Sequence, residues 1–306
     1  MKLNPDKMAF GRHETFALRY GWLSKGFQNL LKTPGILESD DATVVLGVGR
    51  NMVTSIRYWL RACQMISPVD NTPTELGNLL LTDDGFDPYL EDEATIWLLH
   101  WLLVTNSEQA TSLYWFFCLF HKAEFTVQEL ATALTDFAND KMANRKKVSS
   151  STLKNDAALI CRMYTQSKAD ARAPLEDALD SPFSLLGLVH HSSASKLYQS
   201  RPAARSALPL GVLGFAVCQL FEEKQLTAIP MEDFMYSREN LAAPGAVFRL
   251  SESDLVAKLE RLVDFIPGVF EIRDTAGQHQ LYMIAKRTPI DFLVKHYHES
   301  LEGIAA

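Results

Sequence analysis

The chain has 306 residues, 47% of them hydrophobic, and a formal net charge of −7. This length predicts two or three modules with separate cores, and the acidic balance excludes a protein coated with basic surface. Any nucleic-acid contact must therefore come from local basic patches. The four cysteines are far apart without a CxxC pair, and no apolar run is long enough for a bilayer. The N-terminus also lacks an apolar signal-peptide core. We therefore expect a cytoplasmic protein with buried, reduced thiols and no membrane partner.

The first long helix is expected over residues 15–31, where apolar side chains recur at helical spacing. A cation, a titratable base and an acid stand directly before it, as Arg12, His13 and Glu14. Such a cluster could act on a phosphodiester, with His13 as general acid or base and Arg12 on the developing charge. In the structural alternative, Glu14 favours a helix N-terminus and His13 packs under Phe10.

Residues 41–66 predict a short apolar helix, a tight Gly47-Val48-Gly49 turn and a longer amphipathic helix. A cationic stripe without any acid runs along the second helix, opposite its apolar arc. This is the outline of a helix-turn-helix. The alternative is a surface helix with a solvated basic face. The DNA-contacting residues predicted here are Arg50, Asn51, Thr54, Arg57 and Arg61.

Residues 65–74 are expected to form a short strand and loop, at the place where a winged helix has its wing. A DNA-binding module would then cover residues 20–85. The acidic stretch 83–93 follows it. We interpret that stretch as a linker and a helix N-terminus rather than a metal site, because clustered carboxylates beside Pro and Gly are usually solvated.

A second helix-turn-helix-like unit is predicted within residues 125–164, opened by a capping box at Thr126 and Glu129. Segment 141–154 carries five cations without an acid between them and leads into a polar helix face, which suits phosphate contacts. The alternative is a solvated loop. The DNA-contacting residues predicted here are Arg145, Lys146, Lys147, Ser151, Lys154 and Asn155.

The last part of the chain predicts helices over residues 210–222 and 251–265, followed by a hairpin over 269–284. This is again winged-helix order, but the second helix exposes acids, so this copy is expected to bind protein rather than DNA. The sequence as a whole predicts a mainly α fold of two or three winged-helix or helix-turn-helix-like units with small β-hairpin wings. The predicted domains are residues 1–105, 106–170 and 171–306.

Three stretches carry a family resemblance: FGRHETFALRYGWLSKGF, LGVGRNMVTSIRYWLRA and LLLTDDGFDPYLEDEATIWLLHWLL. The chain resembles the SspB-type component of bacterial DNA phosphorothioation systems over nearly its whole length. The resemblance implies DNA nicking at short sequences in one strand, as part of phage defence. It also implies partners in the same system, namely a PAPS-reductase-like protein, an ATPase and a cysteine desulfurase. It assigns no catalytic residues.

Three hypotheses follow for the function. The first is a DNA-nicking endonuclease that uses Mg²⁺ or Mn²⁺, with unknown metal ligands. The second is a DNA-binding adaptor that recruits the sulfur-inserting partner without cutting. The third is a transcriptional regulator. The sequence contains neither a P-loop nor a glycine motif in the context of a dinucleotide fold, so no organic cofactor is expected.

Overall fold

The structure is a computed structural model, which describes residues 1–142, 147–166, 181–275 and 277–305. The chain forms two compact units. We call residues 3–116 and 121–201 the N-terminal unit, and residues 1–2, 117–120 and 202–306 the C-terminal unit. This division differs from the predicted one, because residues 181–201 group with the N-terminal unit and not with the last domain.

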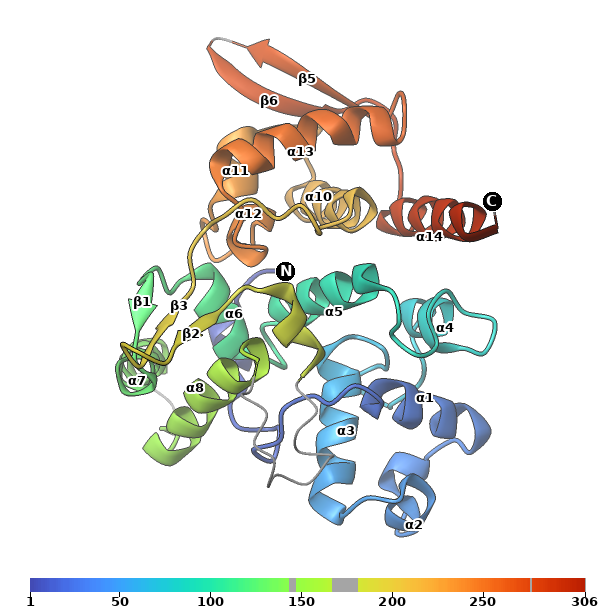
Figure 1. The fold of residues 1–306 in the computed structure, drawn as a ribbon, viewed down its shortest axis with the longest axis vertical. Helices are drawn as coiled ribbons and strands as arrows, with labels where there is room; N and C mark the ends of the chain where they lie inside the picture. Colours follow the sequence, from blue (N-terminus) through green and yellow to red (C-terminus); the bar gives the residue numbers. More distant parts are fainter. Residues whose placement is uncertain (143–146, 167–180, 276, 306) are drawn as a thin grey trace. The chain divides into compact units, whose positions relative to one another are not determined.

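The first half of the N-terminal unit is helical (Figure 1). It contains η1 (Pro5–Lys7), α1 (Trp22–Lys32), η2 (Ile36–Glu38), α2 (Ala42–Leu46), α3 (Arg50–Ala62), α4 (Glu75–Leu81) and α5 (Glu93–Thr105). Helix α5 is buried from Ala94 to Thr105, as expected for a helix that is apolar on all sides. Asp92 caps its N-terminus by accepting a hydrogen bond from the Ala94 N–H, which confirms the predicted role of the acidic stretch.

Helix α1 begins at Trp22, so the prediction of a helix from residue 15 is wrong. Glu14 and Thr15 both have positive φ, at 49° and 65°, which no α-helix tolerates. The next residues, up to Tyr20, have no helical structure, and the Phe16 carbonyl accepts from Trp59 of α3 at 3.2 Å. The apolar periodicity of this stretch therefore comes from packing of a loop, not of a helix.

The predicted pair of helices around the glycine turn is confirmed, as α2 and α3. Gly47 has φ of 63°, the left-handed conformation that closes a helix and favours glycine. Of the short strand and loop expected over residues 65–74, all of them described, the loop forms, whereas the strand is reduced to a single antiparallel bridge. An isolated bridge between Ile66 and Pro73 closes this loop.

The rest of the N-terminal unit combines helices with a small sheet. It comprises α6 (Thr111–Cys118), whose last two residues group with the C-terminal unit, and then β1 (Glu124–Phe125), α7 (Val127–Lys141), α8 (Ser150–Tyr164), η3 (Pro182–Leu186), β2 (His190–Ser192) and β3 (Leu197–Gln199). The predicted capping box opens α7. The sheet is antiparallel with order β1-β3-β2. The pairing of β3 with β1 explains why residues 181–201 belong to this unit.

The C-terminal unit has a second small sheet covered by helices. It comprises α10 (Leu210–Lys224), β4 (Ala228–Pro230), α11 (Met231–Met235), α12 (Pro244–Val247), α13 (Glu252–Phe265), β5 (Phe270–Thr275), β6 (Gln278–Met283) and α14 (Pro289–Ala305). The sheet is antiparallel with order β4-β6-β5, and β5 and β6 form the predicted hairpin (Figure 1). Gly214 allows α10 and α14 to pack closely, because a Cβ there would lie 2.3 Å from the Phe292 ring.

Both units therefore share one succession of elements. A helix and a short strand are followed by further helices and a two-stranded hairpin, and in each sheet the first strand pairs with the last. The fold is mainly α with two three-stranded antiparallel sheets, which confirms the mainly α part of the predicted fold class, whereas the winged-helix units stay a prediction. Among the described residues, no helix has both the length and the apolarity needed to cross a membrane.

All four cysteines are free and buried, as predicted. Burial raises the pKa of the Cys118, Cys161 and Cys218 thiols to about 12 in each case. Because the thiolate is the reactive species, we expect no measurable reaction with a disulfide reagent at pH 8 in the native protein. Denaturation in urea should make all four thiols reactive. Rapid labelling of any thiol without urea would contradict this packing.

Candidate nucleic-acid interface

Helix α3 presents the predicted polar stripe on one side and buries the other. Arg50 and Asn51 in its first turn are exposed, and the Thr54 hydroxyl donates to the Arg50 carbonyl at 3.3 Å. The opposite side is fully buried at Ile56 and Trp59. The N-terminal turn of α3 therefore offers a cation, an amide and free backbone N–H groups to solvent, which is suitable for phosphate or base contacts.

The last two arginines of the stripe are bound to the protein itself. A guanidinium nitrogen of Arg57 lies 3.4 Å from Glu38 Oε1 and donates to the Leu37 carbonyl at 3.5 Å. Arg61 donates from Nε to Asn71 Oδ1 at 2.7 Å, and Asn71 donates to Glu38 Oε1 at 2.9 Å. These residues form one network that fixes the loops on either side of α3, so the predicted stripe is divided into an exposed and an anchored half.

Helix α8 has the polar face that the sequence predicted. Ser151, Lys154 and Asn155 are exposed, whereas Leu153 and Ile160 on the opposite face are 1% exposed. Ser149 caps the helix by accepting from the Thr152 N–H at 3.1 Å. Lys147 is also exposed. Arg145 and Lys146 lie outside the described residues.

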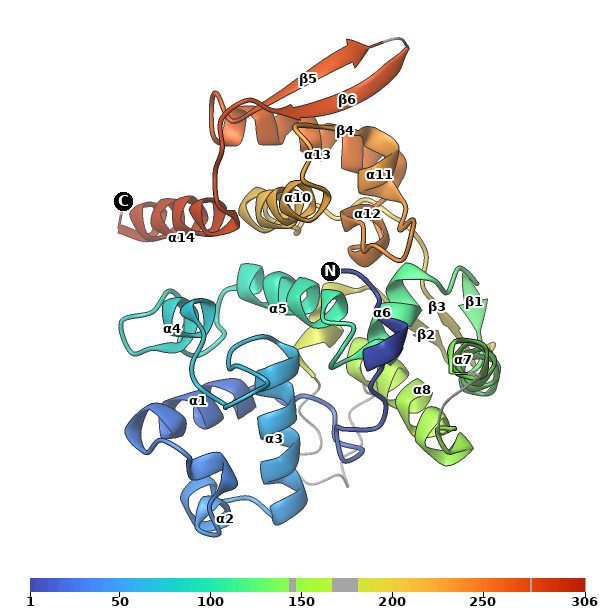
Figure 2. The ribbon, with the colours of Figure 1, turned by 180° about the vertical axis from the view of Figure 1, so that it is seen from behind.

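Residues 9–20 connect α3 with α6 and α8, as the two opposite views in Figures 1 and 2 show. We call them the bridging loop. Its hydrogen bonds reach all three helices. The Ala9 N–H donates to Thr111 of α6 at 2.8 Å, and Ser55 of α3 donates to the His13 carbonyl at 3.2 Å. Arg162 of α8 donates to the Thr15 carbonyl. The loop thus fixes α3 and α8 to one another within the N-terminal unit.

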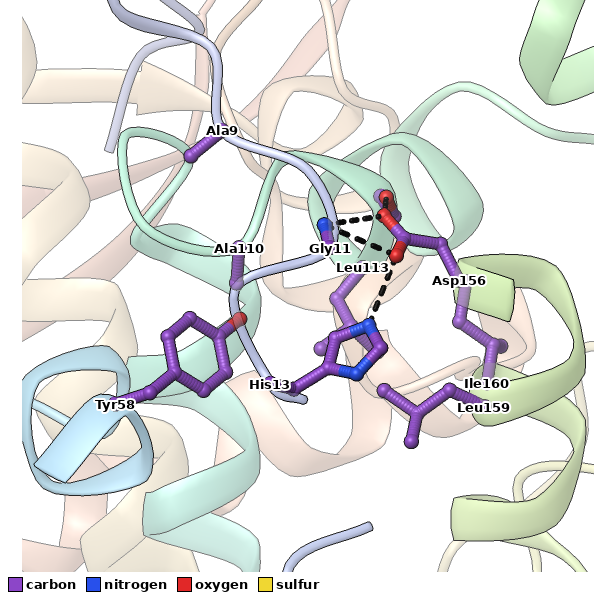
Figure 3. A pocket seen from close by; sticks show the side chains of 10 residues that line it. Ala9, Gly11, His13, Tyr58, Ala110, Leu113, Asp156, Leu159 and Ile160 are labelled. Carbon is purple, nitrogen blue, oxygen red and sulfur yellow. Dashed lines mark hydrogen bonds and ion pairs between the residues drawn. The ribbon is translucent and has the colours of Figure 1, made fainter. Parts of the chain in front are cut away.

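Asp156 of α8 binds the bridging loop at two further places, Gly11 and His13 (Figure 3). Its carboxylate, in a residue 3% exposed, accepts from the Gly11 N–H at 3.1 Å and from the Ser112 hydroxyl of α6. His13 Nε2 lies 2.8 Å from Asp156 Oδ1. The Thr15 N–H donates to His13 Nδ1 at 3.1 Å, so Nε2 carries the proton and donates it to the carboxylate.

His13 is therefore enclosed, and its two ring nitrogens are both engaged. The ring stacks on Trp59 at 6.3 Å between centroids, and the residue is 4% exposed. The hollow beside it has about 10 Å³, about enough for one water molecule, so no phosphodiester fits there. Arg12 and Glu14 are exposed and do not join His13 in one site. The geometry favours a positioning role for His13, and catalysis by these three residues stays a prediction.

The bridging loop adds cations that helical periodicity did not predict as DNA contacts. Arg12 donates to the Gln109 side chain at 3.5 Å, and the Gln109 carbonyl accepts from Tyr58 of α3 at 3.2 Å, so Arg12 lies near α3. Burial and the positive charges of Arg57 and Arg12 lower the pKa of Arg61, against the opposing effect of Glu38. Burial and the charge of Arg19 lower the pKa of Arg162 in the same way. Arginines gathered on one surface are typical of phosphate-binding sites, although Glu38 neutralises part of the charge here.

Asp156 itself was missed by the sequence analysis. A local signal for it exists, because residue 156 falls on the apolar face of α8, between Leu153 and Ile160 at helical spacing. A carboxylate on such a face has to be paired inside the protein.

The described residues form no group of three His, Cys, Asp or Glu side chains that could hold a metal ion. In the acidic stretch, Asp87 accepts from the Glu91 and Asp92 N–H groups at 2.8 and 3.0 Å, so it closes a turn.

Comparison with known proteins identifies the family. A family profile described as "Protein of unknown function (DUF4007)" matches residues 10–297. The chain is 30% identical to the protein in the "SspB crystal structure", with a TM-score of 0.80 over 95% of this chain and 88% of that one. The chain belongs to the DUF4007 family and is of the SspB type. This confirms the resemblance found in the sequence.

A second solved structure of the SspB type is also similar. It is the "Magnesium ion-bound SspB crystal structure", 28% identical, with a TM-score of 0.81 over 96% of this chain and 90% of that one. No curated protein matches the chain.

Proposed function

We propose that this SspB-type protein binds duplex DNA through one face of its N-terminal unit, with α3 and α8 as the DNA-contacting helices. The observation that carries the proposal is the bridging loop. It holds two helices with polar, cationic outer faces in a fixed relation, and it adds Arg12 and Arg19 beside them. Two helices held rigidly can contact the backbone at two places and so fix the register on DNA.

The order of elements supports the same proposal. Helix, strand, two helices and a hairpin is winged-helix order, with the third helix placed to read DNA. In the N-terminal unit this order runs from α6 to β3, and α8 is its third helix. The exposed Ser151, Lys154 and Asn155 then occupy the position where side chains contact phosphates and base edges.

For the reaction, we propose that the bound duplex is nicked in one strand within a phosphorothioation system that includes the PAPS-reductase-like protein, the ATPase and the cysteine desulfurase. The SspB similarity supports this pathway, and the similarity to a magnesium-bound SspB structure supports Mg²⁺ as the ion. We assign no residue to the cleavage step, because the described side chains group no metal ligands.

One experiment tests binding and nicking together. Fluorescence anisotropy with a labelled duplex over a range of salt concentrations should give an affinity that falls steeply with salt, with a slope of about −0.9 per phosphate contact. Supercoiled plasmid incubated with the protein and Mg²⁺ or Mn²⁺ should yield nicked circles, and EDTA should stop the reaction. A salt-independent affinity, or none, would refute DNA binding.

The engaged state of His13 favours a second candidate function, the adaptor that binds DNA without cutting it. A histidine with both nitrogens hydrogen-bonded is not available as a general base until its contacts break. Salt-dependent binding with intact plasmid in every metal condition would support the adaptor and refute the nickase.

A further inference from the structure

We propose that the groove between α11, α13 and the β5–β6 hairpin binds a segment of a partner protein in which Lys or Arg alternates with aliphatic side chains. The proposal concerns the C-terminal unit alone and does not depend on DNA binding. It rests on three observations: the size of the groove, its apolar floor, and the sign of the charges on its rim.

The groove is large enough for several side chains of a peptide. Its volume is about 440 Å³, compared with about 10 Å³ for the hollow at His13. Residues from the three elements supply its apolar part, namely Pro230 and Met231 at the start of α11, Val256 on α13 and Ile272 on β5. Each of these four is half-buried, so an apolar side chain placed against them would remove further apolar surface from water.

Acids dominate the rim of this groove. The lining contains Glu232, Asp233, Glu252 and Glu260, against Arg238 as the one full cation among the lining residues. Arg238 lies 2.9 Å from Glu232 and 3.9 Å from Asp233, and Lys224 lies 2.9 Å from Asp233, so both acids of α11 are paired within the unit. Within the described part of the chain, Glu252 and Glu260 are in no ion pair, and both are exposed on α13. These two carboxylates are available to cations of a ligand.

The charge also decides between classes of ligand. The two units share one succession of elements, but α8 exposes Lys154 at its polar face, whereas α13 exposes Glu252 and Glu260. Phosphates would be repelled by the second face, while Lys or Arg side chains would be attracted. An apolar floor with acids on its rim fits a basic, aliphatic peptide rather than a nucleic acid.

The test uses the full chain and three fluorescein-labelled peptides of about 12 residues each. One alternates Lys with Leu, one alternates Lys with Ser, and one alternates Glu with Leu. We expect the Lys-Leu peptide to bind at least about tenfold more tightly than the other two in fluorescence anisotropy. Equal binding of the Lys-Ser peptide would overturn the proposal, because the apolar floor would then have no part.

Two variants locate the binding. E252K/E260K should weaken binding of the Lys-Leu peptide by at least about tenfold, because the lysines of the peptide would then be repelled at two positions where carboxylates attracted them. D83K/D84K changes the net charge equally on two exposed acids of the N-terminal unit and should change this affinity by less than about twofold. An equal loss of peptide affinity in both double variants would show that binding responds to net charge alone, and it would overturn the proposed site.

A third variant keeps the charge. Val256→Gln should weaken binding of the Lys-Leu peptide and leave the weaker binding of the Lys-Ser peptide unchanged. This test does not depend on whether E252K/E260K is stable. Two further readouts exclude other occupants. A lower duplex-DNA affinity in Val256→Gln, which leaves the charge unchanged, would assign the groove to DNA. A changed sedimentation coefficient of that variant without peptide would assign it to a second copy of the chain. Either result would overturn the proposal.

Discussion

Replacing Asp156 by alanine should lower the free energy of unfolding by about 3–5 kcal/mol, because three donors would lose their shared acceptor. The carboxylate accepts from Gly11, His13 and Ser112, and these donors stay buried when it is removed. Each unsatisfied buried donor costs about 1–3 kcal/mol. Urea denaturation at constant m-value measures the loss. Because the same contacts join the bridging loop to α8, the affinity for duplex DNA should also fall.

Two variants serve as controls for Asp156. Asp136→Ala removes an exposed carboxylate from the neighbouring helix α7 and should change the stability by at most about 0.5 kcal/mol. Asp156→Asn keeps the shape of the side chain and one acceptor oxygen. Its loss of unfolding free energy should therefore lie between those of Asp136→Ala and Asp156→Ala. If Asp156→Ala unfolds at the same urea concentration as the parent protein, the hydrogen bonds at Asp156 do not hold the N-terminal unit together.

Reversing Arg50 and Lys154 together to Glu should weaken duplex binding on the order of 100-fold and reduce the salt slope by about 2. Both side chains are exposed, one on each proposed DNA-contacting helix. The anchored residues Arg57 and Arg61 are less suitable, because their network with Glu38 and Asn71 would be lost with them. Each single reversal should give about half of the change in binding free energy, as expected for independent sites.

The matched control reverses Lys32 and Arg261, which are exposed elsewhere and change the net charge equally. Charges farther from the DNA than about 10 Å are largely screened at 0.1 M salt, so this variant should bind nearly as the parent protein does. Circular dichroism checks that both variants are folded. Equal affinity of the two double variants would refute α3 and α8 as the contact surface.

Local patterns in the sequence predicted the helices and their faces. The apolar spacing identified the buried sides of α3 and α8, and the capping box at Thr126 identified the start of α7. These features depend on residues three or four positions apart, which periodicity detects.

Contacts between distant residues were not predictable in this way. The pairing of β3 with β1 joins residues 75 positions apart and placed the domain boundary after residue 201. The ion pair of Arg57 with Glu38 is a second example. Helical spacing within α3 predicts that Arg57 is exposed, but the distant Glu38 binds it to the protein. Residues 15–20 showed helical spacing, but hydrogen bonds to α3 and α8 hold them as a loop. Tertiary contacts outweighed local propensity there.

The span of the His13–Asp156 contact has a consequence for biosynthesis. The two residues are 143 positions apart. At a translation rate of about 5–20 residues per second, the ribosome needs roughly 7–30 s to add the second after the first. During that interval the nascent bridging loop lacks its buried acceptor, while α1 to α3 are already synthesised. The N-terminal unit therefore completes its folding only after α8 has left the ribosome, and chains truncated before Asp156 are expected to expose this region to proteases.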